Sequence, residues 1–401
     1  MFGIIIYKKR EDDAMKITEN IKYIGVNDRK TDLFEGQYII PNGIAYNSYV
    51  IIDSKIAVFD TVDVNFIEEW FKNITDAIDG RTPDYLIVHH MEPDHSAGIK
   101  AFAERYPHAK IISSAASFRM MKRFFNDDFL SRQIVVEDGD RIELGNHVLN
   151  VVSAPMVHWP EVIMTYESSQ KVLFSADAFG KFGALDADED WACEARRYYF
   201  GIVGKYGAQV QNLFKKLAGF EIDKICPLHG PILSENIQYY LNIYNIWSSY
   251  EAETDGILIS YTSVYGNTKR AVMLLAEMLK ALGCPKVAVN DLARCDMAEA
   301  VEDAFRYSKH VFATTSYNGD VFPFMREFIN HLLERNYQNR KVAFVENGSW
   351  APVAKKVMKS MLENSKDITF VDTSVTILSA LNHESELQLK ELAKELCKDY
   401  Q

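Results

Sequence analysis

Hydrophobic and polar positions follow two different patterns along the chain. In the first pattern, from about residue 20 to 230, short β-rich runs alternate with amphipathic helices. Residues 48–52 and 56–59 are apolar runs separated by an Asp-Ser-Lys turn, which predicts paired strands. Apolar side chains at helical spacing predict helices over 65–78 and 96–105. Further strands are predicted at 85–88, 110–112, 133–136, 148–152, 162–166, 171–175 and 224–226. This mixture predicts two sheets packed face to face with helices outside, an αββα sandwich.

The second pattern follows a predicted helix at 235–248 and a polar stretch at 249–255 that we expect to be a linker. Five predicted strands then alternate with helices, at 256–261, 286–289, 310–314, 341–346 and 369–372. Five β–α units indicate an α/β domain with a doubly wound, five-stranded parallel sheet. We therefore predict domains at 15–250 and 256–401, with residues 1–14 an extension outside the fold.

Composition narrows the class of protein. The chain of 401 residues has 48% hydrophobic and 25% charged residues, and its net charge is −12. This negative charge disfavours non-specific binding to nucleic acid or to anionic membranes. No apolar run approaches the roughly 20 residues that span a bilayer, so we expect a cytoplasmic protein. The five cysteines form no C-x-x-C pair, which argues against a disulfide framework, an iron–sulfur cluster or a zinc ribbon.

A compact group of histidines and carboxylates follows the strand predicted at 85–88. It reads His90-Met-Glu92-Pro-Asp94-His95 and stands just before a predicted helix. Imidazole together with carboxylate suits iron, zinc or manganese. Taken alone, the string is also compatible with a polar turn and a helix cap at Asp94.

Three later residues favour the metal interpretation. His158, Asp177 and His229 each stand just past a predicted strand, so they can converge with the first group on one rim of the sheets. Together these residues supply enough ligands for two metals, and Asp177 can bridge them. His89 points opposite to His90 if both lie on a strand, which favours a supporting or packing role.

A possible phosphate loop follows the strand at 256–261. The strand leads into a turn rich in hydroxyls and then into a helix, and backbone amides at a helix N-terminus form an anion site. Neither a G-x-G-x-x-G nor a Walker lysine is present. The turn resembles the flavodoxin loop that binds the terminal phosphate of FMN. Its candidate contacts are Thr262, Ser263, Val264, Tyr265, Gly266, Asn267 and Thr268.

Two more loops follow central strands of the same predicted sheet. In open α/β sheets, ligands bind at the carboxyl ends of such strands. Tyr317 and Trp350 are placed to stack against an isoalloxazine ring, although either could instead cover the sheet edge. The candidate contacts in these loops are Thr315, Ser316, Tyr317, Asn318 and Gly319, and then Asn347, Gly348, Ser349 and Trp350.

The order H-x-E-x-D-H, then H, D and H, resembles the flavodiiron proteins (A-type flavoproteins), which join a metallo-β-lactamase-like domain to a flavodoxin-like domain. Similarity runs from about Tyr23 to the C-terminus, through Phe34-Glu-Gly, Tyr46-Asn-Ser-Tyr and the run that starts at Asp188. The resemblance implies FMN and a non-haem di-iron site. One iron would be held by His90, Glu92 and His158, and the other by Asp94, His95 and His229, with Asp177 bridging. It implies no catalytic residue beyond these ligands.

Glu92 separates two functional hypotheses. Hydrolases of this fold typically have histidine at that position and use zinc, whereas a carboxylate shifts the preference toward iron. We therefore predict a terminal reductase rather than a zinc hydrolase fused to a flavodoxin module. An electron carrier with a vestigial metal site is disfavoured because all seven ligand positions are filled.

The reaction follows from the resemblance. FMN would pass electrons to the di-iron site, which reduces O2 to water or NO to N2O. We expect an external donor because no rubredoxin-type cysteine pairs follow the second domain; rubredoxin is favoured over F420H2. The resemblance also implies a head-to-tail homodimer or a dimer of dimers. The ligands are the same for both gases, so they do not separate O2 from NO.

Overall fold

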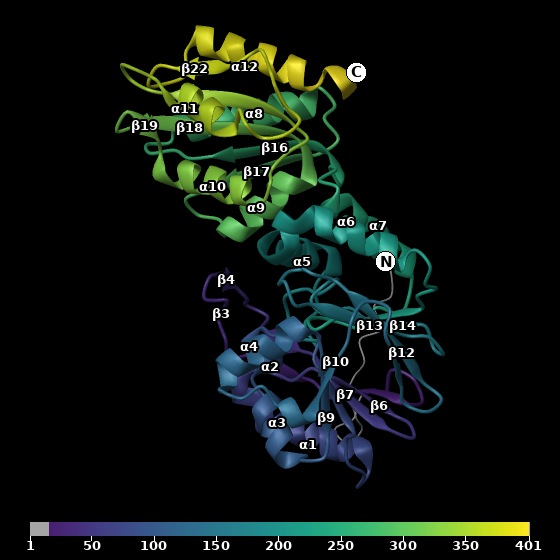
Figure 1. Cartoon of the computed structure of the whole chain (residues 1–401). Helices are drawn as coiled ribbons and strands as arrows, with labels where there is room; N and C mark the ends of the chain where they lie inside the picture. Colours follow the sequence, from purple (N-terminus) through teal and green to yellow (C-terminus); the bar gives the residue numbers. More distant parts are fainter. Residues whose placement is uncertain (1–15, 401) are drawn as a thin grey trace. The chain divides into compact units, whose positions relative to one another are not determined.

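The apolar faces of two β-sheets form the core of the N-terminal part in the computed structural model, which describes residues 16–400 (Figure 1). The first sheet has the order β1-β6-β7-β8-β9-β10 and the second has the order β11-β12-β13-β14-β15. The first comprises β1 (Ile21–Tyr23), β6 (Tyr49–Ile52), β7 (Ile56–Phe59), β8 (Tyr85–Ile87), β9 (Lys110–Ser113) and β10 (Gln133–Val135). The second comprises β11 (Arg141–Glu143), β12 (Val148–Ser153), β13 (Ile163–Glu167), β14 (Val172–Phe174) and β15 (Lys224–Cys226).

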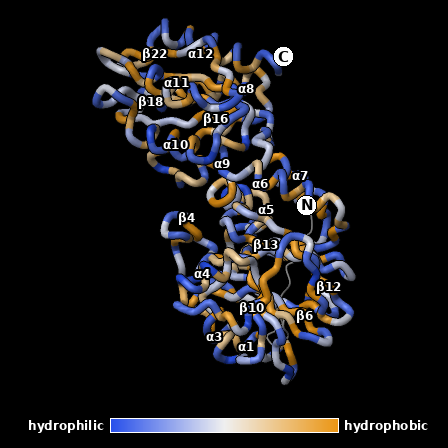
Figure 2. The backbone as a smooth tube through the Cα atoms, viewed as in Figure 1, coloured by the Kyte–Doolittle hydropathy of each residue, from blue (hydrophilic) through white to orange (hydrophobic). Residues whose placement is uncertain are grey.

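Packing between these sheets is aromatic at its centre. The rings of Phe59 on β7 and Phe174 on β14 stack with their centroids 4.2 Å apart. Outside the first sheet lie α1 (Ile67–Ile78), α3 (Ile99–Arg105) and α4 (Ala115–Phe125). Trp70 of α1 is fully buried and donates its indole N–H to Ser48 Oγ at 2.9 Å. The predicted αββα sandwich is confirmed, with hydrophobic residues concentrated along strands such as β6 (Figure 2).

Two short strand pairs and further helices complete this part of the chain. The pairs are β2 (Val26–Asp28) with β5 (Ile44–Tyr46), and β3 (Leu33–Phe34) with β4 (Tyr38–Ile39). The helices are α2 (Pro93–Ser96), α5 (Trp191–Tyr198), α6 (Gly207–Leu217) and α7 (Ile237–Ser248). A π-helical segment, Tyr199–Val203, follows α5.

A parallel sheet with the order β17-β16-β18-β20-β21 forms the C-terminal part, and β22 also pairs with β20. Its strands are β16 (Thr254–Tyr261), β17 (Val287–Asp291), β18 (Tyr307–Tyr317), β20 (Arg340–Asn347), β21 (Ile368–Phe370) and β22 (Val375–Ile377), with β19 (Asp320–Val321) antiparallel to β18. The helices are α8 (Asn267–Ala281), α9 (Met297–Arg306), α10 (Pro323–Glu334), α11 (Ala354–Leu362) and α12 (His383–Leu396). In chain order the strands run 2-1-3-4-5, which is the flavodoxin-like order. The predicted doubly wound sheet is confirmed.

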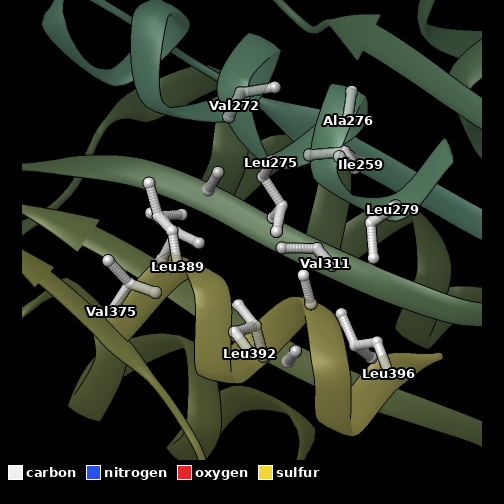
Figure 3. Packing of buried hydrophobic residues seen from close by; sticks show 14 of the residues in the cluster. Ile259, Val272, Leu275, Ala276, Leu279, Val311, Val375, Leu389, Leu392 and Leu396 are labelled. Carbon is white, nitrogen blue, oxygen red and sulfur yellow. The ribbon is translucent and has the colours of Figure 1, made fainter. Parts of the chain in front are cut away.

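Alternation along the central strand β18 places apolar side chains on both faces of this sheet. Val311 joins Leu275 of α8 and Leu392 of α12 in one buried cluster (Figure 3). Phe312 points to the other face, where its ring lies 6.0 Å from that of Phe328 on α10. Because both faces are covered, the sheet is buried as a parallel sheet requires.

Local predictions were wrong at two places. The helix predicted over 96–105 is instead two helices, α2 and α3, so Asp94 and His95 lie inside the first of them. Gly98 separates the two, and a Cβ there would lie 2.9 Å from Thr61 Cβ, so this residue permits close packing. The fifth strand, predicted at 369–372, is divided into β21 and β22, which pair with successive parts of β20.

Contacts within the chain define two compact units whose borders differ from the predicted ones. The first unit holds the described residues up to Tyr199 together with Ala208–Asn242, and the second holds Phe200–Gly207 with the residues from Ile243 onward. Part of the expected linker is anchored in the second unit, since the buried Arg340 guanidinium donates to Tyr250 O at 2.7 Å. The stretch 1–14 lies outside the described residues. No helix between residues 16 and 400 is long and apolar enough to cross a membrane.

We expect the packing of α12 to be sensitive to loss of volume. Leu392→Ala should lower the free energy of unfolding of the second unit by about 2–5 kcal/mol, because it removes a fully buried side chain and leaves a cavity. Urea unfolding followed by circular dichroism measures this. The control is Lys390→Ala on the exposed face of the same helix, which should change the free energy by less than about 0.5 kcal/mol. Equal effects of the two substitutions would contradict the packing described.

Candidate metal centre and cofactor loops

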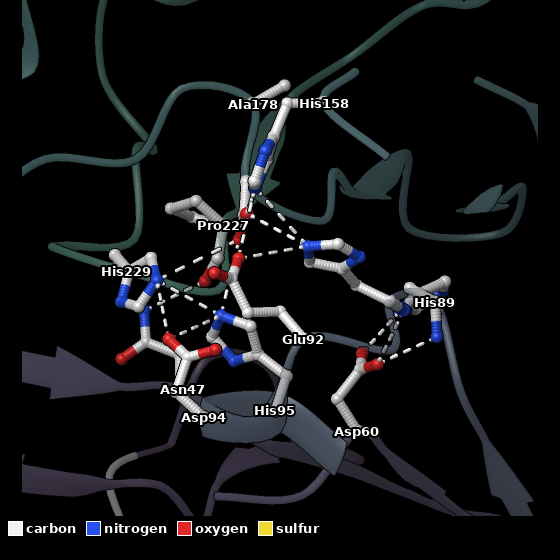
Figure 4. A network of polar contacts seen from close by, with 12 residues as sticks. Asn47, Asp60, His89, Glu92, Asp94, His95, His158, Ala178, Pro227 and His229 are labelled. Carbon is white, nitrogen blue, oxygen red and sulfur yellow. Dashed lines mark hydrogen bonds and ion pairs between the residues drawn. The ribbon is translucent and has the colours of Figure 1, made fainter. Parts of the chain in front are cut away.

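The sequence-predicted ligands converge at one rim of the N-terminal unit. His90 follows β8, His158 follows β12, Asp177 follows β14 and His229 follows β15. Strands β12 and β14 are both antiparallel to β13, and β15 is parallel to β14, so these three strands end on the same edge. The fold therefore brings together residues that lie far apart in the sequence (Figure 4).

One group of ligand atoms comprises His90, Glu92, His158 and Asp177. His158 Nε2 lies 3.0 Å from Glu92 Oε2 and 3.0 Å from Asp177 Oδ2. His90 Nε2 lies 3.3 Å from Glu92 Oε2 and 3.4 Å from Asp177 Oδ2. Two N or O ligands that are each about 2.1 Å from one metal ion lie about 3 to 3.5 Å apart. The spacing of this group fits a single ion.

A second group comprises Asp94, His95 and His229, and Asp177 also reaches it. His95 Nε2 lies 3.0 Å from His229 Nε2, and both nitrogens lie 3.3 Å from Asp94 Oδ2. Asp177 directs Oδ1 at His95 Nε2, at 3.3 Å, and Oδ2 at the first group. One carboxylate therefore faces both groups, as a bridging ligand would.

Buried polar atoms without hydrogen-bond partners support this interpretation. Among the described residues they include both carboxylate oxygens of Asp94 and Oδ1 of Asp177. A buried carboxylate oxygen without a partner is costly, and a cation in the centre would satisfy all three atoms. The donor set of imidazoles and carboxylates fits iron, zinc or manganese.

The electrostatics of the cluster also favour a cation. Burial opposes the charge of the His90 imidazolium, but the Asp177 and Glu161 carboxylates hold its pKa well above the ordinary value. The pKa of His158 is raised to about 9, because Asp177 and Glu92 outweigh burial. Conversely, the pKa of Asp177 is well below the usual range despite its burial, because His90 and His158 stabilise the carboxylate. The carboxylates therefore attract positive charge, from protons or from metal ions.

Several supporting groups were not identified from the sequence. Glu161 Oε1 lies 2.8 Å from His90 Nδ1, and the carbonyl oxygen of Ala45 lies 2.8 Å from His229 Nδ1. Glu35, in the turn between β3 and β4, has its pKa raised to about 7 by desolvation and by the neighbouring Glu92 carboxylate. Phe34-Glu-Gly belonged to the family resemblance, which was the one signal available for Glu35.

His89 points away from the cluster, as predicted. Its ring is held between Asp60 Oδ2, 2.6 Å from Nδ1, and Thr165 Oγ1, 2.9 Å from Nε2. Asp60 Oδ1 also accepts the backbone N–H of His89 at 2.7 Å. These contacts hold the His89 ring on the opposite side of the chain from the metal ligands.

The predicted phosphate loop has the expected form of strand, turn and helix. Ser263 Oγ accepts the backbone N–H groups of Gly266 and Lys269 at 3.1 and 3.2 Å, which shapes the turn before α8. Gly266 has φ +87°, a left-handed conformation that favours glycine, and the space where its Cβ would lie is open. Val264 and Tyr265 are exposed on the turn, and the hydroxyls of Thr262 and Thr268 are buried beneath it.

The other two loops lie at the ends of β18 and β20. Asn347 Nδ2 donates to Thr268 Oγ1 at 3.3 Å, so the end of β20 contacts the start of α8. Ser316 Oγ accepts the N–H groups of Val353 and Ala354 at the start of α11, which gives this residue a capping role. The Thr315 hydroxyl is buried without a hydrogen-bond partner among the described residues.

Exposed aromatic side chains surround these three loops. Tyr265 and Trp350 are each 91% exposed, which is unusual for such large apolar rings and suits a surface that a flat ligand covers. Tyr317 is 45% exposed and contacts Phe322. A cavity of about 580 Å³ beside Tyr317 and Asn318 extends along α10 and does not include the other two loops. The three loops, rather than this cavity, form the candidate flavin surface.

Comparisons with known proteins are consistent with this geometry. Residues 44–230 match the model described as "ODP family beta lactamase". The anaerobic nitric oxide reductase flavorubredoxin of Salmonella arizonae is 27% identical over 88% of this chain and 76% of its own length. Rubredoxin oxygen:oxidoreductase from Desulfovibrio gigas is 25% identical with a TM-score of 0.88, covering 97% of this chain and 98% of that one. The flavodiiron protein from Giardia intestinalis shares the fold with a TM-score of 0.88, at 20% identity, over 98% and 100% of the two chains.

Adjacent histidines provide a test of the metal assignment. We expect His90→Ala to bind fewer metal ions per chain than the unaltered protein, because its Nε2 faces the first ligand group. His89→Ala should retain the full metal content, although it lowers the free energy of unfolding by about 3–5 kcal/mol by leaving Asp60 buried without its partner. Elemental analysis of the folded variants checks the metal content. The assignment would be contradicted if His89→Ala lost metal and His90→Ala did not.

Proposed function

We propose that the chain is a flavodiiron protein, a terminal reductase which passes electrons from FMN to a di-iron site to reduce O2 to water, NO to N2O, or both. The observation that carries the proposal is the pair of ligand groups facing one shared carboxylate, Asp177, in a chain that also carries a flavodoxin-like sheet. When bound, the two irons supply a site that binds and reduces the gas, and FMN supplies the electrons.

Seven side chains would hold the metals. His90, Glu92 and His158 would hold one, Asp94, His95 and His229 would hold the other, and Asp177 would serve both. The histidine rings are buried, and each uses Nε2 toward the centre. The Nδ1–H groups of His90 and His229 donate to Glu161 and to the Ala45 carbonyl. These bonds set the tautomer and the direction of both rings.

Glu92 favours iron over zinc. Its carboxylate lies between His90 and His158, where a typical hydrolase of this fold has a third neutral imidazole. An added anionic oxygen ligand favours a harder metal and stabilises a higher oxidation state. The alternative, a zinc hydrolase fused to an electron carrier, does not account for the Glu92 carboxylate and gives FMN no part in the reaction at the metal centre.

The carboxyl ends of β16, β18 and β20, with the turns that follow them, would bind FMN. The start of α8 presents backbone N–H groups and hydroxyls, including that of Ser263, which suit a phosphate dianion. Tyr317 and Trp350 would lie against the flavin ring. The proposed contacts are Thr262–Thr268, Thr315–Gly319 and Asn347–Trp350.

Two further parts of the proposal concern partners. We propose an external electron donor, with rubredoxin favoured over F420H2. The similarity to a protein named rubredoxin oxygen:oxidoreductase supports this choice. We also propose a head-to-tail homodimer, or a dimer of dimers, because the two cofactor sites lie in separate units and electrons must pass between them.

Gas consumption provides the direct test of the reaction. The purified protein, reduced under anaerobic conditions, should be reoxidised by O2, by NO or by both, and electrodes for each gas measure the rate. Iron and FMN should each be present in the purified protein by elemental analysis and absorption. Full occupancy by zinc, with no reoxidation by either gas, would reject the reductase and favour the hydrolase.

A single substitution separates the two cofactors. Asp177→Ala should lose most of the bound metal, because it removes the carboxylate that faces both ligand groups. It should retain FMN, because the flavin loops lie in the other unit. Iron content and flavin absorbance measure the two quantities on one sample. Loss of both cofactors from a variant with native circular dichroism would contradict the assignment of separate sites.

A further inference from the structure

We infer that Glu161 is a positioning residue that makes the two metal positions unequal, so that the position formed by His90, Glu92 and His158 binds metal more tightly and fills first. This inference rests on the proposed function only because it requires two metal positions. It concerns a residue that orients a metal ligand, and it predicts the order in which the two positions bind metal.

Glu161 is a buried carboxylate with a defined task. It is 2% exposed, and its Oε1 lies 2.8 Å from both His90 Nδ1 and the backbone nitrogen of Met91. A carboxylate only accepts hydrogen bonds, so Nδ1 of His90 carries the proton and Nε2 keeps its lone pair for a metal. The main chain of Glu161 is fixed as well, because its carbonyl accepts the Ser114 hydroxyl at 3.0 Å. The carboxylate therefore orients the His90 ring from a fixed support.

The second position has no such support. His229 Nδ1 donates to a neutral backbone carbonyl, that of Ala45, at 2.8 Å. Nδ1 of His95 is buried and has no hydrogen-bond partner among the described residues. At the second position, Nδ1 of His229 therefore has a neutral hydrogen-bond partner, and Nδ1 of His95 has none among the described residues.

This difference has a chemical consequence. An anionic acceptor at Nδ1–H raises the basicity of the imidazole, strengthens its bond to a metal and fixes the ring in the binding orientation. A neutral carbonyl does so more weakly, and an unpartnered ring must be oriented by packing alone. Glu161 also adds a negative charge close to the first position. Both effects strengthen binding there.

Cobalt titration of the metal-free protein tests the inference without turnover. Under anaerobic conditions, Co²⁺ absorption with a competing chelator should show two equivalents per chain, one tighter than the other. Two ligand variants identify them: His95→Ala should lose the weaker equivalent, and His158→Ala should lose the tighter one. The reverse pattern would overturn the inference.

Variants at position 161 then test the cause. Glu161→Met keeps the approximate size but removes the acceptor, and it should weaken the tighter equivalent by about 10–100-fold. Glu161→Gln keeps an oxygen that can accept from Nδ1–H but loses the charge. Its cobalt affinity at the tighter position should therefore lie between that of the unaltered protein and that of Glu161→Met. Unchanged affinity in Glu161→Met would overturn the inference; if that variant does not fold, unchanged affinity in Glu161→Gln would do so.

A matched control excludes general loosening of the sheet. Thr165 is buried on β13, near Glu161 in the sequence, and its hydroxyl contacts the ring of His89, which faces away from the centre. Thr165→Val should leave both equivalents unchanged. An equal loss in Thr165→Val and Glu161→Met would show that packing, rather than the Glu161 carboxylate, sets the affinity. The two tests can fail separately. If cobalt binds in the two steps described, but the reduced protein with iron and FMN consumes neither O2 nor NO, the proposed reaction is rejected and this inference stands.

Discussion

Buried negative charge at one rim of the N-terminal unit is the constraint on which the rest of its structure depends. Asp60, Glu161 and Asp177 are each 2% exposed or less, and Asp94 is little more accessible. Withdrawing a carboxylate from water costs several kcal/mol unless hydrogen bonds and opposite charges compensate. His89 and backbone N–H groups compensate Asp60, but Asp94 and Asp177 face inward with oxygens that lack hydrogen-bond partners. Two divalent cations would balance this centre.

The sheets make such a concentration of charge possible. Five strands bury apolar side chains and end next to the metal centre: β7, β8, β12, β14 and β15. The buried carboxylates are therefore supported by a rigid core. Phe59 and Phe174 stack one residue and three residues before Asp60 and Asp177, respectively. The core therefore holds close together carboxylates that would repel one another and separate in a flexible chain.

The local sequence predicted the metal ligands but not the groups that hydrogen-bond to them. His90, His158, Asp177 and His229 each follow an apolar run, so strand ends alone predicted that they meet. Glu161 and the Ala45 carbonyl act through contacts 71 and 184 residues away along the chain, and a backbone carbonyl has no sequence signature at all. For the same reason the local sequence could not predict how residue 250 is anchored, because that contact is made by Arg340, on a strand that lies 90 residues later.

Both candidate sites follow one rule, since each collects its residues at the carboxyl ends of strands, but the residue types give them opposite electrostatics. In the N-terminal unit, buried carboxylates and imidazoles create a centre that attracts cations. In the C-terminal unit, the turn before α8 offers backbone N–H groups and the Ser263 hydroxyl, which suit an anion. Hydrolysis would require only the first site. A chain that maintains a cation site with Glu92 and an anion site bordered by exposed aromatic rings is better explained by electron transfer between two cofactors.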